Sequence, residues 1–537
     1  MKTTIKAEKK YLNIPVNNEA SQERVFVYVD GKIDYYFDLQ LANKGEADFW
    51  VYMDIGRYAG CEITLKTTRD SATDPEAFNQ LYQSDEPKEA ASFYKEKKRP
   101  QLHFTSKRGW LNDPNGLVYY KGEYHLFYQH NPYGWKWGNM HWGHAVSKDL
   151  VHWAELGDAL LSDELGTIYS GSAVVDWDNT SGFGSDGEPP IVAIYTAAGN
   201  HAPVEVPFTQ CIAYSNDKGR TWNKYSGNPV LGHIRDSNRD PKVIWHEQSK
   251  KWIMALFIDG KDYSLFSSPD LKNWKKLSDF EGGYECPDFF PMMLDGNPDE
   301  IKWVFWTADG TYFLGSFDGT TFTPETGMKR CYDGGNVYAG QTFSDIPDSD
   351  GRRIHIPWLR EPGKAFVGMR FNQQMGFPVE FTLRSTSQGA AIFTWPVQEI
   401  ENIYAETHKF VNKTLSSENN LFDDFDDDML DIYAEFEIED NDAVFGFEIK
   451  GQRFVYDCKK SEIDAMGQVA HIAPQNGRIN MRILVDRVSI EFFAGDGLVY
   501  MPFCLPSPEK ESPRIFSEGG SSRLVTLVVN KLESIWD

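Results

Sequence analysis

The segment Ser147-Lys148-Asp149-Leu150-Val151-His152-Trp153 recurs in altered form three times further along the chain. The echoes are Ser-Asn-Asp-Lys-Gly-Arg-Thr-Trp at 215–222, Ser-Ser-Pro-Asp-Leu-Lys-Asn-Trp at 267–274 and Ser-Phe-Asp-Gly-Thr-Thr-Phe at 316–322. Each copy follows a strand-like run and closes on an aromatic residue, and the copies lie roughly 50 to 70 residues apart, the length of a four-stranded blade with its loops. Four copies, together with a hairpin that follows Asp113, predict a five-bladed β-propeller.

The sequence on either side of this region predicts two further β-domains. Near the N-terminus, Asp30-Gly31 joins two aromatic and β-branched runs, which is a strong hairpin signal. A polar, helical link is expected around residues 74–98. From about residue 405, period-two alternation between Gly and Asn-Gly turns is typical of a β-sandwich. The expected fold is all-β, with an N-terminal β-module at 1–95, a five-bladed β-propeller at 99–400 and a C-terminal β-sandwich at 405–537.

Composition and charge exclude several classes of function. A chain of 537 residues is too long for one ordinary core. Its 54 Lys and Arg against 79 Asp and Glu give a formal charge of −25, which repels nucleic acid and anionic membrane surfaces. No apolar run reaches the roughly 18 residues that span a bilayer. The six cysteines lie far apart and form no C-x-x-C pair, which argues against a zinc ribbon or a redox motif. A disulfide framework is not expected either, and most of the cysteines are interpreted as small buried hydrophobic residues. The acidic run at 423–428 is interpreted as a solvated loop, and no metal site is predicted.

Three acidic residues of the predicted propeller stand in turn-like contexts near strand starts. Asp113 lies in Trp-Leu-Asn-Asp-Pro-Asn-Gly at 110–116, Asp240 in Arg-Asp-Pro at 239–241, and Glu285 in Tyr-Glu-Cys-Pro-Asp at 284–288. Taken singly, each is better explained as a turn residue or an ordinary ion pair. The first strand of every blade lines the channel of a propeller, so three such residues can meet there. Cleavage of a glycosidic bond requires one carboxylate as nucleophile and one carboxylic acid to protonate the leaving oxygen.

In this order the three motifs resemble glycoside hydrolase family 32, the invertase, inulinase and levanase family, over about residues 100–537. Further matches are Phe-Tyr-Gln-His-Asn-Pro at 127–132, Met-His-Trp-Gly-His-Ala at 140–145, Tyr-Ser-Gly-Ser-Ala at 169–173 and Val-Asp-Arg at 485–487. The resemblance implies a five-bladed propeller followed by a β-sandwich. The first 95 residues fall outside it, and their role stays open.

The resemblance also assigns roles to individual residues. It implies that Asp113 is the nucleophile, that Glu285 is the general acid and base, and that Asp240 stabilises the transition state. A double displacement of this kind retains configuration and places the two reacting carboxyl groups about 5 to 5.5 Å apart. The positions that match the substrate pocket of the family are Asn112, Gln129, Trp137, Ser170 and Arg239. Tyr338 and Trp358 are further candidates, for which core packing is an equal alternative.

The function implied is that of a retaining β-fructofuranosidase or fructan β-fructosidase, most like a bacterial exo-acting enzyme. Its substrate would be a fructan such as levan or inulin, or a fructosyl-oligosaccharide, with sucrose as a further candidate. The alternatives on the same scaffold are an endo-acting levanase or inulinase, a fructosyltransferase and, least favoured, a non-catalytic fructan-binding protein. A sialidase shares the hairpin box at 215–222, but it needs an arginine cluster and a tyrosine nucleophile, and it gives Asp113 no role.

Cofactor and location follow from the same interpretation. The double displacement needs no metal and no organic cofactor. Polymeric fructans do not enter a cytoplasm intact, so a periplasmic or secreted enzyme is expected. The first residues, Met-Lys-Thr-Thr-Ile-Lys, lack the apolar segment of an export signal, which keeps a cytoplasmic location as the alternative.

Overall fold

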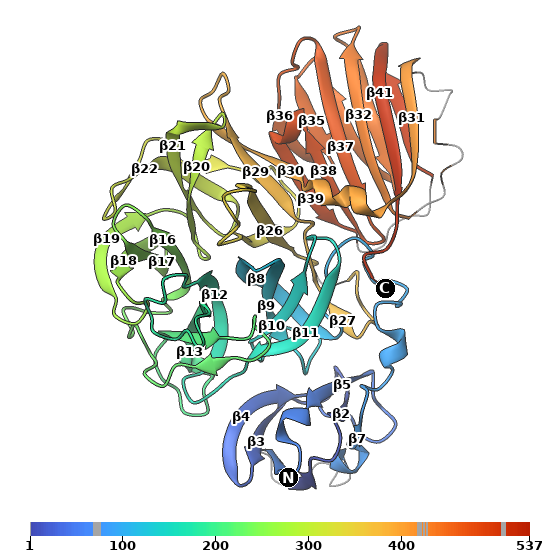
Figure 1. Cartoon of the computed structure of the whole chain (residues 1–537). Helices are drawn as coiled ribbons and strands as arrows, with labels where there is room; N and C mark the ends of the chain where they lie inside the picture. Colours follow the sequence, from blue (N-terminus) through green and yellow to red (C-terminus); the bar gives the residue numbers. More distant parts are fainter. Residues whose placement is uncertain are drawn as a thin grey trace.

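The computed structural model describes residues 2–67, 77–362, 364–415, 421–422, 425, 428–505 and 512–536. Along the chain, a small N-terminal β-module is followed by a five-bladed propeller and then by a two-sheet sandwich (Figure 1). The described helices are short 3-10 turns: η1 (Gly56–Tyr58), η2 (Ala77–Gln80), η3 (Ala90–Ser92), η4 (Gly199–His201), η5 (Gln398–Ile403) and η6 (Gly495–Gly497). The all-β prediction is therefore confirmed.

The N-terminal module consists of two small sheets. One sheet has the order β1 (Lys2–Lys6), β6 (Glu62–Thr67), β3 (Glu23–Val29), β4 (Lys32–Leu39), and the other β5 (Phe49–Asp54), β2 (Tyr11–Val16), β7 (Tyr82–Ser84). Asp30 and Gly31 both have positive φ, +46° and +80°, which is the backbone that a tight hairpin turn requires. The predicted helical link is wrong for the described residues 77–98. They form two 3-10 turns and the strand β7. The backbone of β7 pairs with the neighbouring strand β2, whereas a helix would satisfy its hydrogen bonds within the segment.

Each blade of the propeller is an antiparallel sheet whose first strand is the inner one. Blade 1 comprises β8 (Gly109–Tyr120), β9 (Glu123–Asn131), β10 (His141–Ser147) and β11 (Trp153–Leu160). Blade 2 comprises β12 (Thr167–Val175), β13 (Ile191–Ala198), β14 (Thr209–Ser215) and β15 (Asn223–Lys224). Blade 3 comprises β16 (Arg239–His246), β17 (Lys251–Asp259), β18 (Asp262–Ser268) and β19 (Lys275–Glu281).

The last two blades follow the same pattern. Blade 4 comprises β20 (Asp288–Leu294), β21 (Asn297–Trp306), β22 (Thr311–Phe317) and β23 (Phe322–Pro324). Blade 5 comprises β25 (Val337–Thr342), β26 (Arg353–Leu359), β29 (Val379–Arg384) and β30 (Ala391–Pro396). Three two-residue strands add to the blades: β24 (Lys329–Arg330) pairs with β22, β28 (Gln374–Met375) pairs with β26, and β27 (Phe371–Asn372) pairs with β8 of blade 1. Of these, β27 pairs in parallel with β8, so the end of the propeller returns to its first blade.

The repeated segments form the hairpins between the third and fourth strands of blades 1 to 4. In the third copy, Asp270 accepts hydrogen bonds from the backbone N–H groups of Lys272 and Asn273 at 3.0 and 2.8 Å. The indole of Trp274 donates to the Leu271 carbonyl at 3.0 Å, which closes the loop. The number of blades was predicted correctly, but one of the five was inferred from the wrong hairpin. The hairpin after Asp113 belongs to the same blade as the first copy, and the fifth blade carries no copy.

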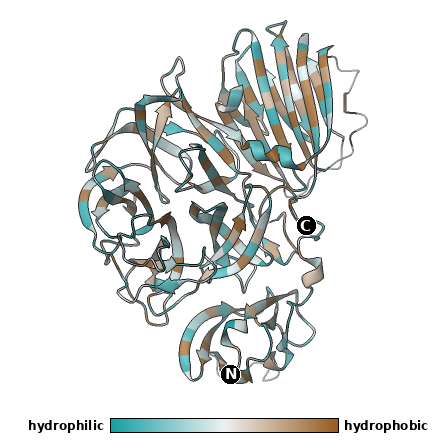
Figure 2. Ribbon diagram, viewed as in Figure 1, coloured by the Kyte–Doolittle hydropathy of each residue, from teal (hydrophilic) through white to brown (hydrophobic). Residues whose placement is uncertain are grey.

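The C-terminal sandwich packs a six-stranded sheet on a five-stranded one. The first has the order β31 (Tyr404–Thr414), β41 (Ser522–Leu532), β32 (Leu430–Ile438), β37 (Arg478–Val485), β38 (Ser489–Ala494), β39 (Val499–Cys504). The second has the order β36 (Gln468–His471), β35 (Glu462–Ala465), β34 (Gln452–Asp457), β33 (Val444–Ile449), β40 (Arg514–Glu518). Hydrophobic and hydrophilic residues alternate along these strands, and the inward set forms one apolar core (Figure 2).

The predicted domain limits at 1–95, 99–400 and 405–537 stay a prediction. The sheets themselves run from β1 to β7, from β8 to β30 and from β31 to β41. Most of the acidic run at 423–428 lies outside the described residues.

Candidate active site

Four inner strands of the propeller, and the segment that leads into the inner strand of blade 4, each bring one polar side chain to a common cluster. Asp113 comes from β8, Ser170 from β12, Asp240 from β16, and Tyr338 from β25, while Glu285 lies three residues before β20. These residues are far apart in sequence but linked by the contacts described below. The propeller thus joins residues from every blade in one cluster, as the sequence predicted for the three carboxylates.

The motif around Asp113 lies within the strand β8, which has bulges, and is not the turn near a strand start that we predicted. The pairing of β8 with β9 shifts register between Leu111 and Pro114 and again between Asn115 and Val118. Turn-forming residues suit a bulge for the same reason that they suit a turn, because both need unusual backbone angles. Gly116 has a φ of +52°, and a Cβ there would lie 2.8 Å from the Phe127 ring. A bulge re-aims side chains, and this one directs Asp113 to the cluster.

Both oxygens of Asp113 accept hydrogen bonds from neutral donors. The Ser170 hydroxyl donates to Oδ2 at 2.6 Å, and the Asn112 amide donates to Oδ1 at 3.0 Å. The Asn112 carbonyl oxygen in turn accepts from the indole of Trp110 at 2.9 Å, which fixes the orientation of the amide. Burial raises the pKa of Asp113, and the charge of Glu285 adds to this rise, whereas the bonds from Ser170 and Asn112 oppose it. The carboxylate is thus held in one position by neutral donors, and no cationic side chain of the described residues forms an ion pair with it.

Glu285 has different partners, and they are charged or phenolic. Arg239 forms an ion pair with its Oε1, and the Tyr338 hydroxyl donates to Oε2 at 2.7 Å. The Glu285 side chain is 22% exposed, so it reaches the channel. Both Glu285 and the following Cys286 have positive φ, +52° and +33°, which shows that the backbone here is bent to present the side chain.

Asp240 is the most enclosed of the three carboxylates, with a side chain only 6% exposed. Its backbone also adopts positive φ, +63°, and its N–H donates to the Thr196 hydroxyl at 3.0 Å. Burial raises the pKa of Asp240, as do the charges of Glu285 and Asp113, against the opposing effect of Arg239, whose Nε lies 3.6 Å away. One guanidinium therefore spans Asp240 and Glu285.

Cys286 lies between two of the carboxylates. Its Sγ is 3.7 Å from Asp113 Oδ2 and 3.5 Å from Asp240 Oδ2, and its N–H donates to the same Asp240 oxygen at 3.3 Å. Burial and the charge of Asp240 raise the pKa of the Cys286 thiol well above its ordinary value. The thiol is therefore protonated and acts as a weak donor to the carboxylates.

Aromatic rings form the wall beside Tyr338. Trp358 meets Trp110 edge to face at 6.1 Å and Tyr338 at 6.5 Å between ring centroids. Its indole N–H donates to Gln373 Oε1 at 3.1 Å. The Arg360 guanidinium lies 4.8 Å from the centre of the Tyr338 ring. The ring of Trp358 thus contacts the aromatic residues of the cluster, while its indole N–H is hydrogen-bonded within the protein.

In the part of the chain that the structure describes, neither Gln129 nor Trp137 hydrogen-bonds to one of the three carboxylates. Gln129 is buried and donates to the Ile168 carbonyl at 3.0 Å. Trp137 is 47% exposed and lies against Tyr169 and His201, with ring centroids 6.1 and 5.7 Å away. Gln129 contacts Ile168 and Trp137 contacts Tyr169, so both lie beside the segment that carries Ser170. Ser170 in turn contacts Asp113.

Sequence reasoning missed several residues of this site. Cys286 was treated with the other cysteines as a buried apolar residue, although its place beside Glu285 was a usable signal. Tyr263, which donates to the Glu285 carbonyl at 3.0 Å, and Arg360 gave no signal, because both reach the site from strands or loops with no motif.

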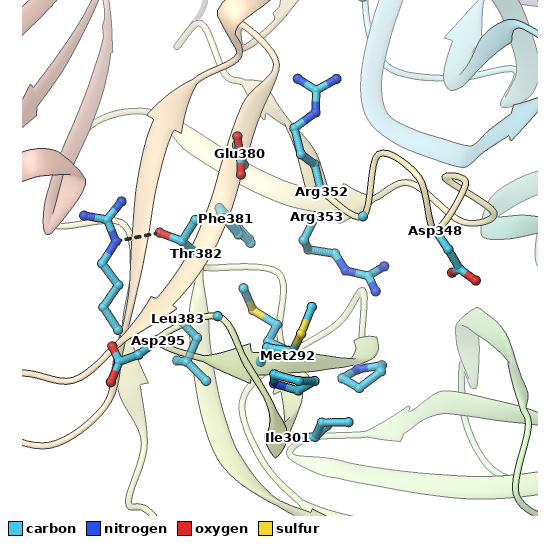
Figure 3. Close-up of a pocket in the computed structure, with 16 residues that line it drawn as sticks. Met292, Asp295, Ile301, Asp348, Arg352, Arg353, Glu380, Phe381, Thr382 and Leu383 are labelled. Carbon is cyan, nitrogen blue, oxygen red and sulfur yellow. Dashed lines mark hydrogen bonds between the residues drawn. The ribbon is translucent and has the colours of Figure 1, made fainter.

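A separate cavity of about 840 Å³ lies between blades 4 and 5 (Figure 3). Met292, Arg353 and Glu380 are among the residues that line it, and Arg384 donates to the Thr382 hydroxyl at 3.0 Å beside it. None of the residues predicted for the active site lines this cavity. The cluster of three carboxylates is therefore separate from this cavity.

The family model of the glycosyl hydrolases family 32 N-terminal domain matches residues 103–396, and the model of the family 32 C-terminal domain matches residues 399–531. The chain belongs to glycosyl hydrolase family 32. The two matched segments cover the propeller and the sandwich, and both lie beyond the N-terminal module.

This family 32 protein is similar to curated enzymes over most of its length. It is 39% identical over 493 residues to a levanase of Bacillus subtilis (strain 168), covering 83% of this chain and 72% of the levanase. It is 32% identical over 525 residues to an extracellular exo-inulinase of Aspergillus ficuum, covering 83% of this chain and 96% of the inulinase.

Solved structures of other family members share its fold. An exo-inulinase from Aspergillus awamori matches with a TM-score of 0.73 and 30% identity, over 82% of this chain and all of that one. A fructofuranosidase variant from Schwanniomyces occidentalis, complexed with fructosylnystose, also gives 0.73, with 28% identity, over 82% of this chain and 98% of that one. Among the described helices of the family 32 protein, none has the length and apolar character needed to cross a membrane.

Proposed function

We propose that this protein is a retaining β-fructosidase that releases terminal β-D-fructofuranosyl units from fructans. The observation that carries the proposal is the convergence of Asp113, Asp240 and Glu285 at the channel, with the two more accessible carboxylates in contrasting surroundings. Asp113 has neutral donors on both oxygens, whereas Glu285 is paired with Arg239 and Tyr338. Two carboxylates in different environments are what a double displacement requires.

In the first step, an oxygen of Asp113 attacks the anomeric carbon of the fructosyl unit. The bond to the leaving oxygen breaks as Glu285 gives that oxygen its proton, so a fructosyl-enzyme ester and a free alcohol result. The hydrogen bonds from Ser170 and Asn112 hold the nucleophile in place for this attack. In the second step, the Glu285 carboxylate takes a proton from water, whose oxygen displaces Asp113 and restores the enzyme.

Asp240 and Arg239 serve the transition state. Positive charge develops on the sugar ring as the bond to the leaving oxygen lengthens, and the buried Asp240 carboxylate is placed to bind ring hydroxyls and to favour that charge. Arg239 bridges Asp240 and Glu285, so the positions of the two groups are coupled. Cys286 limits the repulsion between Asp113 and Asp240 by offering a thiol proton to them.

The substrate class rests on the relatives. The levanase and exo-inulinase named above support a fructan, and the exo-inulinases support release of terminal units. An endo-acting enzyme and a fructosyltransferase use the same carboxylates and differ in which products they form. Product analysis therefore separates them.

The test incubates levan, inulin and sucrose separately with the wild type and with Asp113→Ala, and follows the released sugars over time. We expect free fructose as the early product from at least one fructan and none from the variant. Early short oligosaccharides would replace exo with endo action, and products longer than the substrate would indicate a transferase. If the wild type releases nothing from any fructan or sucrose, the hydrolase assignment fails.

The role of Glu285 has its own test. Glu285→Ala should lower kcat/KM by about a hundredfold or more on sucrose, whose leaving group needs a proton, and far less on an aryl fructoside with an activated leaving group. Steady-state rates on both substrates measure the contrast. An equal loss on the two would remove Glu285 from the acid role.

We also propose that the enzyme works outside the cytoplasm. The relatives include proteins named as extracellular exo-inulinases, and polymeric fructan is available there. Immunodetection in cell fractions of the source organism would test this, and confinement to the cytoplasmic fraction would contradict it.

A further inference from the structure

A second, smaller cavity of about 280 Å³ lies between the N-terminal module and the rim of the propeller. Module residues Gln22, Arg24, Tyr36 and Asp38 line one side, and propeller residues including Trp137 and His201 line the other. The module lies at the edge of the propeller, beside blade 1 (Figure 1). Neither family model matches the module side of this cavity, because both matches begin after it.

The cavity is joined to the reaction centre by two neighbouring residues. Trp137 and His201 both contact Tyr169, and the Tyr169 hydroxyl shares a hydrogen bond of 3.0 Å with His201 Nε2. The next residue, Ser170, donates to Asp113. A chain that leaves the site over Tyr169 therefore meets the wall of the cavity.

The module is held firmly in this position. The Asn139 side chain accepts a hydrogen bond from the Asp38 N–H at 2.5 Å and donates to the Asp38 carbonyl at 2.6 Å. The rings of Phe37 and Tyr133 stack at 3.8 Å between centroids, and the hydroxyls of Tyr35 and Tyr133 share a hydrogen bond of 2.9 Å. These contacts are made by the backbone of Asp38 and by its neighbours. The Asp38 carboxylate takes no part in them and lines the cavity.

The lining has the chemistry of a carbohydrate site. Trp137, 47% exposed, offers an aromatic face on which the apolar side of a sugar ring stacks. Arg24 and Asp38 are bound to each other by two hydrogen bonds of 2.9 and 3.2 Å, which leaves further N–H groups and oxygen lone pairs for vicinal hydroxyls. The Tyr36 hydroxyl is buried and has no hydrogen-bond partner among the described residues.

The size of the cavity limits what it can hold. Sites for drug-sized ligands begin at about 300 Å³, so the space suits one sugar ring and not a longer segment. The cavity lies at the rim of the propeller, outside the reaction centre. The part of a substrate that departs as the leaving group would lie there.

We propose that this cavity is a subsite for a sugar unit on the leaving-group side of the scissile bond, built jointly by the N-terminal module and the propeller. The inference rests on the proposed function, since it needs a fructosyl chain with its terminal unit at Asp113. It gives the module a role in choosing polymeric over small substrates.

The test compares kcat/KM on an aryl fructoside, which has no leaving-group sugar, with kcat/KM on oligofructans of increasing length. In the double variant Arg24→Ala with Asp38→Ala, both partners are removed, so no unpaired charge remains. We expect kcat/KM on the oligofructans to fall about tenfold more than on the aryl fructoside. Gln22→Ala, an exposed residue of the same wall, should give a smaller loss of about threefold in the same ratio.

The matched control is Lys9→Ala with Asp85→Ala, which removes an exposed ion pair of the same module away from the cavity. It should leave the ratio as in the wild type. A thermal unfolding scan of each variant shows whether the module stays folded, and Gln22→Ala carries the test if the double variant does not. An unchanged ratio in Gln22→Ala and in a folded double variant would overturn the subsite. Absence of aryl fructoside hydrolysis by the wild type would instead reject the proposed function.

Discussion

In the proposed mechanism, the shorter of the two hydrogen bonds to Asp113 helps to keep this nucleophile ionised. The Ser170 hydroxyl lies 2.6 Å from Oδ2 and stabilises the ionised form, against burial and the charge of Glu285, which raise the pKa of Asp113. A nucleophile must be ionised to attack, so its pKa sets the acid side of the pH–rate profile. If Asp113 is the nucleophile, as proposed, the serine extends activity toward low pH.

Ser170→Ala should move the acid limb of the kcat/KM profile to higher pH, because the loss of a donor raises the pKa of Asp113 further. On the acid limb, the rate should fall by roughly two- to tenfold more than on the neutral plateau. Rates on an aryl fructoside between pH 4 and 8 measure the shift. Ser278→Ala, in the outer strand β19 of blade 3, is the control. An acid limb of Ser170→Ala that coincides with that of the wild type would count against the role of Ser170.

At the scale of elements, two devices build the propeller. The hairpin box closes the outer strand of four blades through an aspartate that binds backbone N–H groups, as Asp270 does in blade 3. The bulges of β8 do the reverse and break the regular ladder, so that Asp113 points into the cluster. The first device serves stability and the second serves the site.

Asp270→Ala should lower the midpoint of thermal unfolding by roughly 2–5 °C, because two backbone N–H groups lose their acceptor. KM on the preferred substrate should stay within twofold of the wild-type value, since the hairpin lies on the outer edge of the blade. Burial acts to raise the pKa of Asp270, but the hydrogen bonds outweigh it and lower this pKa. Their stabilisation is therefore present above the unfolded value near 3.9 and is lost as the pH falls through the folded value. Calorimetry of the variant beside Asp299→Ala measures the effect, and equal midpoints in the two would refute it.

The hairpin boxes were readable in the sequence because each is local, with its aspartate and its closing aromatic residue within a few residues. The carboxylates were found because each sits in a short motif. The bulge at Asp113 was missed because turn and bulge use the same residues. The approach of Asn139 to Asp38 could not be predicted, since the two residues come from different domains and neither stands in a motif. The fifth blade was misassigned because it has no box and its strands β26 and β29 are separated by a long excursion.

At the scale of the whole molecule, a buried polar network joins the propeller to the sandwich. His103 Nδ1 lies 2.8 Å from Asp486 and its Nε2 lies 3.0 Å from Glu491, and all three side chains are fully buried. Asp486 also accepts from the backbone N–H groups of Gln101 and Leu102. The Val-Asp-Arg motif of the sandwich is thus a docking element, which explains its place in the resemblance.

His103 should make the stability of this interface depend on pH. Burial acts to lower the pKa of His103, but the bonds to Asp486 and Glu491 raise it to about 9, above the ordinary value near 6.5. Its contribution is therefore fully present below about pH 6.5 and is lost as the pH rises through about 9. His103→Gln should lack this slope and, near pH 6.5, should destabilise the protein by roughly 3 kcal/mol, because a carboxylate loses its charged partner.

Calorimetry between pH 6 and 9.5 measures the difference between the two proteins. The gap between their unfolding midpoints should narrow as the pH rises. A gap that stays constant over this range would show that His103 is not charged in the folded protein.

The most direct test of the account is to trap the covalent intermediate on Asp113. Glu285→Gln is mixed with an activated aryl β-D-fructofuranoside, which forms the ester without an acid but lacks the base that would hydrolyse it, and the quenched protein is digested for mass spectrometry. We predict a fructosyl adduct on the peptide that contains Asp113, and none when Asp113→Ala is added. An adduct on another residue, or turnover with no adduct and no burst of aryl alcohol, would contradict the account.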